Sequence, residues 1–199
     1  MVRFLILTEI LQFCASKKIR VVADECFLRF HPHYEKMSCK RFLKQYPNLL
    51  IVNAFTKFYA MAGLRLGYLM TGDLSLLHAV AQQLPEWNVS SIAQRAGISA
   101  LQDTEYEKRT RQLIEKERRY LIQEFLKMGC TVFPSEADYI TFRLPQEKTG
   151  FLLKERLLEG KILIRSCANY RNMPPDCYRI AVKQHADNEE LVRQVWRIL

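Results

Sequence analysis

Three short apolar runs in the first 70 residues constrain the fold of this chain more than any other feature. They are residues 19–23, 48–52 and 66–70, each rich in aliphatic side chains. Such runs are typical of buried strands, and the segment 40–46 between the first two is predicted to be a short helix. Residues 4–17 carry apolar side chains at helical spacing. Helix, strand, helix, strand, loop and strand in this order predict an α/β fold with short connections.

The rest of the chain is predicted to form helices and then a small α+β lobe. Helices are expected at 74–84, 90–101 (capped by Asn88 or Ser90), 104–127, 150–158 and 188–198. Short strands are expected at 131–133, 139–142, 162–164 and 178–182. We therefore expect a sheet domain over residues 1–103. Residues 104–199 are expected to form a bridging helix and a small carboxyl-terminal domain.

Composition and charge exclude several classes of function. The formal net charge is +9, but acidic and basic residues alternate along 105–127 without a long block of one sign, so nucleic-acid binding is not expected. A surplus of Lys and Arg suits substrates that carry phosphate and carboxylate groups. No stretch is long and uncharged enough to span a bilayer, so a cytoplasmic protein without a membrane partner is expected.

The six cysteines form no C-x-x-C pair, and their spacing matches no zinc module. No metal site is therefore expected. Most of these cysteines lie in apolar runs, which predicts buried free thiols in a reducing compartment.

Lys57 carries the strongest indication of chemistry. It follows a predicted strand and has Phe55, Phe58 and Tyr59 as near neighbours. Apolar surroundings disfavour the charged form of an amine, and a neutral amine is what forms a Schiff base. The alternative is an ordinary surface lysine in a loop.

Asp24 and Arg65 extend this hypothesis. Asp24 ends the first predicted strand, where a carboxylate either caps a turn or pairs with a protonated ring nitrogen. Arg65 is either a surface cation or a bidentate ligand for phosphate. An amine, a carboxylate and a guanidinium at strand ends and adjoining loops suit pyridoxal phosphate (PLP), which carries an aldehyde, a ring nitrogen and a phosphate.

Two further arginines are candidates for binding an anion. Arg179 lies inside the apolar strand 178–182, where a guanidinium is costly unless it is paired. Its partner is either an anionic ligand or an internal carboxylate. Arg165 follows the predicted strand 162–164 and presents the same two alternatives.

Three motifs resemble those of the class I/II aminotransferases, which are fold-type I PLP-dependent enzymes. Residues 24–27 resemble the D-E-x-[YF] motif, residues 56–68 resemble [ST]-K-x-x-x-x-x-G-L-R-x-G-Y, and residues 177–182 resemble the family's carboxyl-terminal arginine strand. Within the family, segments around Lys57 and at 162–171 are most similar to histidinol-phosphate aminotransferases and threonine-phosphate decarboxylases. The resemblance implies an α/β fold: part of a PLP-binding large domain with a mainly parallel sheet, followed by a small α+β domain.

The resemblance also assigns roles to individual residues. Lys57 would bind the cofactor aldehyde and move protons, and Asp24 would pair with the ring nitrogen. The remaining implied roles are cofactor-phosphate binding by Thr56 and Arg65, ring contact by Phe27, binding of the substrate carboxylate by Arg179 and binding of the substrate phosphate by Arg165. Two positions depart from the family pattern: Ala54 replaces a frequent Ser or Thr, and Phe27 lacks the hydroxyl of a Tyr.

Three functions remain open on the resemblance. The first is decarboxylation of a phosphorylated amino acid, as in the cobalamin pathway, and the second is a histidinol-phosphate-type transamination. The third is an inactive fragment that partners a separate amino-terminal half. The family's glycine-containing phosphate loop, stacking aromatic residue and N-P-x-x-P-T-G motif are not found in this sequence. We therefore expect the carboxyl-terminal half of a longer, homodimeric enzyme, and weak PLP binding by this chain alone.

Overall fold

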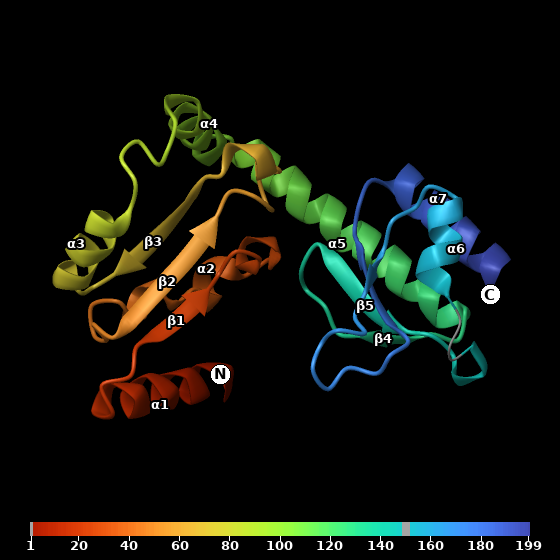
Figure 1. Ribbon diagram of the computed structural model, residues 1–199, viewed down its shortest axis with the longest axis horizontal. Coiled ribbons are helices and arrows are strands. Elements are labelled where there is room, and N and C mark those ends of the chain that lie inside the picture. The colour runs from red at the N-terminus through yellow and green to blue at the C-terminus, as the bar shows by residue number, and fades with distance from the viewer. Residues whose placement is uncertain (1, 149–151) are drawn as a thin grey trace. The chain divides into compact units, whose positions relative to one another are not determined.

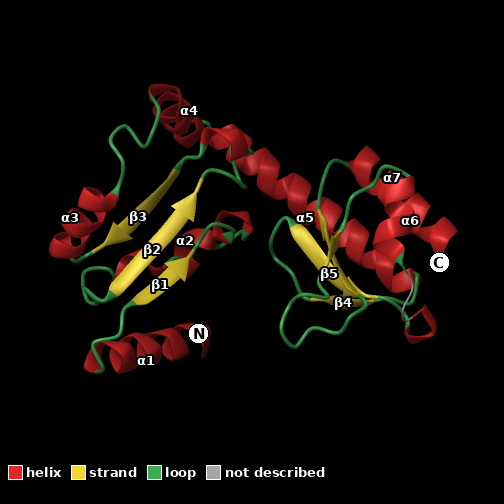
Figure 2. Ribbon diagram, in the orientation of Figure 1, coloured by secondary structure: helices red, strands yellow, loops and turns green. Residues whose placement is uncertain are grey.

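The chain contains two compact units, residues Met1–Glu105 and Tyr106–Leu199. The computed structural model describes residues 2–148 and 152–199, with side chains described from residue 7 onward (Figure 1). Both units combine helices with a sheet, so the predicted α/β class is confirmed (Figure 2).

The sheet of the first unit has the strand order β1-β2-β3. Strand β1 (Val21–Asp24) pairs in parallel with β2 (Leu49–Ala54), whereas β3 (Gly67–Thr71) runs antiparallel to β2. The sequence predicted a mainly parallel sheet, but the described pairings are one of each kind. The reason is the connection: residues 55–66 form a loop without a crossover helix, and a parallel neighbour requires such a crossover.

The helical segments of the first unit are α1 (Val2–Ser16), η1 (Leu28–Phe30), α2 (Tyr34–Met37), η2 (Cys39–Phe42), η3 (Ala62–Leu64), α3 (Leu74–Gln83) and α4 (Ser91–Gln102). Helical segments were predicted at the positions of α1, η2, α3 and α4, whereas the short segments η1, α2 and η3 were not predicted. Ser90 is the N-cap of α4, because its hydroxyl accepts a hydrogen bond from the amide of Ala93. The helix predicted at 40–46 is only the short 3-10 turn η2. Beyond Phe42 the chain continues in turns, in which the amides of Gln45 and Tyr46 both donate to the carbonyl of Phe42.

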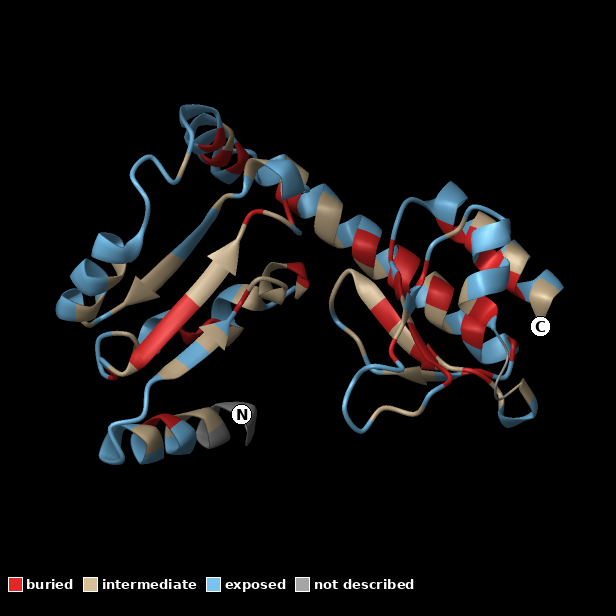
Figure 3. Ribbon diagram, in the orientation of Figure 1, coloured by how far each residue is buried: buried red, intermediate tan, exposed pale blue. Residues whose placement is uncertain are grey.

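The core of this unit lies on one face of the sheet. Leu49 and Ile51 of β2 are fully buried, and they lie beside Leu11 of α1 in one hydrophobic cluster. Figure 3 shows the first half of β2 as buried. Val22 points to the opposite face of β1, and its side chain is 60% exposed. Leu50 of β2 is the register partner of Val22 on that face but is only 7% exposed, so the second face is covered at β2 and open at β1, which is an edge strand.

The second unit is a four-stranded antiparallel sheet packed against helices. Its elements are α5 (Thr104–Lys127), β4 (Thr131–Phe133), β5 (Tyr139–Arg143), η4 (Gln146–Lys148), α6 (Leu153–Glu159), β6 (Arg165–Ser166), β7 (Cys177–Ala181) and α7 (His185–Ile198), with strand order β4-β5-β7-β6. Ile140 and Phe142 of β5 are fully buried, and the Phe142 ring lies 4.3 Å from that of Phe125 in α5. Part of the helix predicted at 150–158 lies outside the described residues.

The strand predicted at 162–164 is displaced along the chain. The residues that pair are Arg165 and Ser166, while Leu163 is 75% exposed. Lys161 adopts a left-handed backbone, and the amide of Ile162 donates to the carbonyl of Leu157 in α6. Residues 161 and 162 therefore belong to the turn that ends α6, although the apolar pattern predicted that a strand begins at 162.

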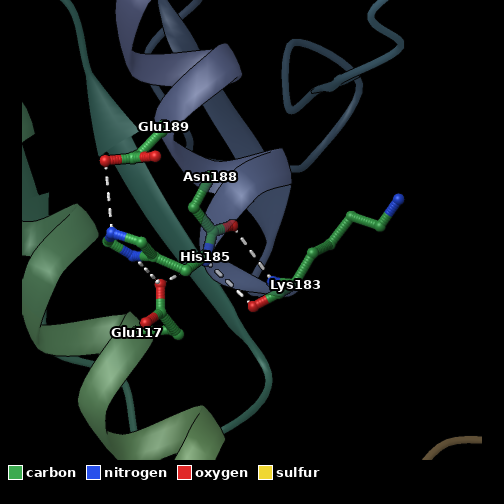
Figure 4. A network of polar contacts seen from close by, with 5 residues as sticks. All are labelled: Glu117, Lys183, His185, Asn188 and Glu189. Atoms are coloured by element: carbon green, nitrogen blue, oxygen red, sulfur yellow. Dashed lines mark hydrogen bonds and ion pairs between the residues drawn. The ribbon is translucent and has the colours of Figure 1, made fainter.

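A buried carboxylate joins α5 to the start of α7 (Figure 4). The Glu117 side chain is 1% exposed, and its Oε2 accepts a hydrogen bond from Asn188 Nδ2 at 3.0 Å. The same oxygen lies 3.0 Å from Nδ1 of His185, whose Nε2 lies 3.2 Å from a carboxylate oxygen of Glu189. Asn188 also bonds both backbone groups of Lys183, which fixes the turn that enters α7.

The charge of Glu117 is stabilised within this network. Burial raises the pKa of Glu117, but the hydrogen bonds from Asn188 and His185, with the charges of His185 and Lys116, outweigh it and hold the pKa below its ordinary value. A lowered pKa in the folded state stabilises the protein above the pKa of the unfolded chain. That contribution is lost as the pH falls through the folded-state pKa.

We predict that Glu117→Gln lowers the free energy of opening of the second unit by about 1–3 kcal/mol at neutral pH, because hydrogen bonds to a charged group are lost. The difference from the wild type should begin to shrink at about pH 4, where the unfolded carboxyl takes up its proton, and should disappear as the pH falls through the lower folded-state pKa. Amide hydrogen exchange in α7 measures this free energy directly.

Glu115→Gln is the matched control, because Glu115 lies on the same helix in an exposed pair with Arg119. Its effect should stay within about 0.5 kcal/mol. Equal effects of the two substitutions would contradict the role given to the buried carboxylate.

Candidate active site

Three of the predicted functional residues lie at one end of the first sheet. Asp24 is the last residue of β1, and Lys57 follows the end of β2 by three positions. Because β1 and β2 are parallel, with Asp24 opposite Val52, their carboxyl ends lie at the same end of the sheet. Arg65 precedes the antiparallel β3 by two positions and so reaches the same end. We call Asp24, Phe27, Lys57 and Arg65 the strand-end cluster.

Asp24 is held as an exposed, ionised carboxylate. Its Oδ1 accepts a hydrogen bond from the amide of Cys26 at 2.9 Å. Hydrogen bonds from the Cys26 thiol and then from the Cys26 amide lower the pKa of Asp24, against a smaller effect of burial. Burial and the adjacent Asp24 raise the pKa of Cys26 to about 11. The thiol therefore stays neutral beside a carboxylate that is open to a cationic partner.

Lys57 presents its amine to solvent beside an aromatic ring. The carbonyl of Lys57 accepts from the amide of Ala60 in a tight turn, and its Nζ lies 5.9 Å from the centre of the Phe27 ring. Phe27 follows Asp24 by three positions, so this contact connects the amine to the segment that carries the carboxylate.

The apolar surroundings predicted for Lys57 are not found. Phe55, Phe58 and Tyr59 are buried, and their rings pack on one another with centres 5.2 Å apart for each contact with Tyr59. Lys57 itself is exposed. The three aromatic side chains are buried against one another, whereas the described contact of the Lys57 amine is with the Phe27 ring.

Arg65 is exposed and sits in an unusual backbone conformation. Its φ angle is 53°, in the left-handed region that costs a non-glycine residue about 1 kcal/mol or more. Its Nη1 donates to the carbonyl of Ala62 at 3.2 Å, which uses one of the five N–H donors of the guanidinium. Thr56 is half-buried next to Lys57, and the amide of Ala54 donates to the side chain of Asn53.

Close packing sets the position of this loop. A Cβ on Gly67 would lie 2.9 Å from the carbonyl oxygen of Asn53, and one on Gly97 would lie 2.5 Å from Leu66. These two glycines therefore let β3 approach β2 and let α4 approach the segment that carries Arg65. A larger residue at Gly67 would push β3 away from the backbone of β2, whereas one at Gly97 would have to move the end of the Leu66 side chain.

Glu25 is a supporting residue that the sequence pattern did not reveal. Its buried carboxylate accepts from the hydroxyl of Ser38 at 2.9 Å and from the amide of Cys39 at 2.6 Å. Its own amide donates to the carbonyl of Val52. Glu25 therefore fixes the chain directly after Asp24, and only its position beside Asp24 in the sequence could have suggested this.

The two other predicted arginines lie together in the second unit. Arg165 of β6 is directly opposite Arg179 of β7 in the antiparallel ladder. Two like charges directly opposite each other repel, so this arrangement favours an anion between or beside them. Within residues 2–148 and 152–199, no ion pair joins either guanidinium to a carboxylate. The alternative of an internal carboxylate partner is therefore not supported.

Tyr139 and Asn169 position these arginines and were missed from the sequence. The guanidinium carbon of Arg179 lies 4.9 Å from the centre of the Tyr139 ring, close enough for a cation–π contact. Arg165 donates from Nη2 to the side-chain oxygen of Asn169 at 3.1 Å. Tyr139 reaches Arg179 through the pairing of β5 with β7, and strand pairing is not readable from the sequence.

The strand-end cluster fits the groups of PLP. An exposed amine, an ionised carboxylate and an exposed guanidinium match an aldehyde, a protonated ring nitrogen and a phosphate in turn, and the Phe27 ring lies beside the amine. No group of three or more His, Cys, Asp or Glu side chains suited to a metal ion occurs in the described parts of the chain. Among the same residues, no helix is long and apolar enough to cross a membrane.

Comparison with known proteins gives relatives of two activities. The model of the family "Aminotransferase class I and II" matches residues 6–195. The threonine-phosphate decarboxylase of Salmonella typhimurium is 35% identical over 195 residues, which is 98% of this chain and 52% of the relative. The histidinol-phosphate aminotransferase of Oleidesulfovibrio alaskensis is 32% identical over 90% of this chain and 46% of its own length.

Solved structures share the fold. The histidinol-phosphate aminotransferase of Clostridium acetobutylicum superimposes with a TM-score of 0.87 at 31% identity, over 94% of this chain and 56% of that protein. The L-threonine-O-3-phosphate decarboxylase of Porphyromonas gingivalis gives a TM-score of 0.78 at 23% identity. This chain spans about half the length of the curated relatives it matches. It belongs to the class I and II aminotransferase family, whose enzymes depend on pyridoxal phosphate.

Proposed function

We propose that this chain contributes the cofactor-binding lysine and the anion-binding arginines of a PLP-dependent enzyme that decarboxylates a phosphorylated amino acid. The activity would resemble that of threonine-phosphate decarboxylase in cobalamin biosynthesis. The main support is the pair Arg165 and Arg179, which lie opposite each other on adjacent strands. Among the residues that the structure describes, neither arginine forms an ion pair with a carboxylate. A phosphorylated amino acid offers two anionic groups, and a guanidinium fork suits both carboxylate and phosphate.

The strand-end cluster would hold the cofactor. Bound PLP supplies an electron sink for the bond that breaks at the substrate α-carbon. The Lys57 amine would join the cofactor covalently and then move protons at that carbon. The Asp24 carboxylate would keep the ring nitrogen protonated, and Arg65 with Thr56 would bind the phosphate. The apolar side chain of Phe27 would contact the cofactor ring, without the hydrogen bond that the hydroxyl of a tyrosine could give.

Binding of the substrate would fall to the second unit. Arg179 would bind the carboxylate, and its contact with Tyr139 restricts the guanidinium to one orientation. Arg165 would bind the phosphate, with Asn169 restricting its orientation in the same way. Two oriented cations select a substrate by the spacing of its anionic groups.

Transamination is the second candidate, because the Clostridium acetobutylicum aminotransferase is similar to this chain in both sequence and fold. The two reactions differ in which bond at the α-carbon is broken, and the side chains described above serve either reaction. Decarboxylation is proposed first because one phosphorylated amino acid would occupy both arginines at once, with its carboxylate at one and its phosphate at the other.

We predict that PLP followed by borohydride modifies Lys57 of the full chain in preference to the exposed Lys18 and Lys127. Arg65→Ala should lower the affinity for PLP, measured by the modification of Lys57, about tenfold to a hundredfold. The reason is the loss of charge-assisted hydrogen bonds to the cofactor phosphate, worth about 1.5–3 kcal/mol. Peptide mass spectrometry over a PLP titration gives the extent of modification at each lysine.

The matched control is Arg95→Ala, which removes an exposed arginine on α4. It should leave the modification of Lys57 unchanged. Modification spread evenly over exposed lysines, with no effect of Arg65→Ala, would refute the cofactor site.

The proposed reaction predicts CO2 release from threonine phosphate by the enzyme that contains this chain. Arg179→Lys should raise KM about tenfold or more, because a lysine cannot form the bidentate contact. Release of CO2 and formation of keto acid are measured on the same samples. Keto acid without CO2 would instead establish the transaminase. If neither product forms although PLP is bound at Lys57, the proposed activity is refuted and only the cofactor binding stands.

A further inference from the structure

Cys167 and Cys177 face each other across the β6–β7 pair. The register of this pair sets Arg165 opposite Arg179 and Ser166 opposite Tyr178. The next rung of the same ladder places Cys167 opposite Cys177, and the amide of Cys167 donates to the carbonyl of Cys177 at 2.8 Å. The antiparallel pairing thus continues one rung past the end of β6.

Both cysteines lie on the face of the sheet that carries the two arginines. Side chains two positions apart along a strand share a face, so Cys167 lies beside Arg165 and Cys177 beside Arg179. The electrostatics agree with this placement. Burial raises the pKa of the Cys167 thiol, and the charges of Arg179 and Arg165 oppose that rise. Burial and the neighbouring Cys167 raise the pKa of Cys177, and the charge of Arg143 opposes them in part.

The spacing of such a pair suits a covalent bond. Directly opposite residues that share a ladder hydrogen bond have Cα atoms about 5.5 Å apart. Disulfides are formed across Cα distances of about 4.4–6.8 Å. The Cα spacing therefore lies in the disulfide range, and closing the bond draws the Cβ atoms of this hydrogen-bonded pair together by about 1 Å.

We propose that Cys167 and Cys177 are a redox modification site that forms a reversible disulfide by exchange with a small-molecule disulfide. The Cys167 thiolate attacks one sulfur of the reagent, forms a mixed disulfide and releases one reagent thiolate, which takes up the proton that Cys167 lost. Cys177 then loses its proton and attacks the Cys167 sulfur, which releases the second reagent thiol. Two protein thiols are oxidised, and one reagent disulfide is reduced to two thiols.

Cys167 is the first nucleophile for two reasons. Arg165 and Arg179 favour its thiolate, and thiolates carry out the attack. Its side chain is only 3% exposed, but the loop 168–172 that follows it is exposed throughout. Opening of this loop uncovers Cys167 without unfolding the sheet. Cys177, which is fully buried within β7, is suited to the second step.

Full-length chain equilibrated with oxidised glutathione tests this proposal. Trypsin cleaves after Arg165, Arg171 and Arg179, so the two cysteines fall in separate peptides, 166–171 and 172–179. The expected product is these two peptides joined by a disulfide, with the free thiols of the chain falling from six to four. Reduced glutathione in excess should restore all six.

Two variants sharpen the result. Cys130→Ser removes another buried cysteine and should leave the joined peptides unchanged. Cys177→Ser removes the second nucleophile, so a glutathione should accumulate on Cys167. The proposal is overturned if Cys167 and Cys177 remain thiols when Cys14 and Cys26, which are less buried, already carry glutathione. It is equally overturned if each of the pair carries its own glutathione.

Discussion

The parallel pairing of β1 with β2 is the constraint on which the candidate site depends. It brings the carboxyl ends of two strands to the same end of the sheet, so Asp24 and the loop that carries Lys57 converge without any direct bond between them. The antiparallel β3 completes the arrangement, because its first residues lie beside the last residues of β2. The candidate residues from three separate segments are therefore positioned by backbone hydrogen bonds, and the side chains of Asp24, Lys57 and Arg65 are exposed.

The second unit uses pairing in a different way. Its antiparallel register sets two arginines opposite each other, which opposes folding unless an anion or aromatic ring compensates the charge. The Tyr139 ring beneath Arg179 compensates in part. The cost of holding two cations together is typical of binding sites, where stability is given up for recognition.

Local patterns in the sequence were enough to predict most elements. The long helix α5 has its predicted bounds, and β2 and β3 lie within two residues of theirs, because apolar periodicity determines which segments bury a face. The short helix before Pro47 and the strand at 162–164 were misplaced. At 43–46 and at 161–162 the chain forms turns instead, which the apolar pattern does not indicate.

The site was predictable only as a list of residues. Motifs identified Asp24, Lys57 and Arg65, but the exposure of Lys57 and its contact with the Phe27 ring were not indicated by its apolar neighbours in the sequence. The supporting roles of Glu25 and Tyr139 depend on contacts between segments distant in sequence. Such contacts follow from strand register, which no local pattern encodes.

Nuclear magnetic resonance of the isotopically labelled chain, titrated with pyridoxal phosphate, tests the convergence of these segments most directly. If one cofactor molecule binds at the strand-end cluster, the amides of residues 24–27, 56–60 and 64–66 should shift together with a single binding constant. Shifts confined to one of these segments, or scattered over both units with different constants, would contradict the account.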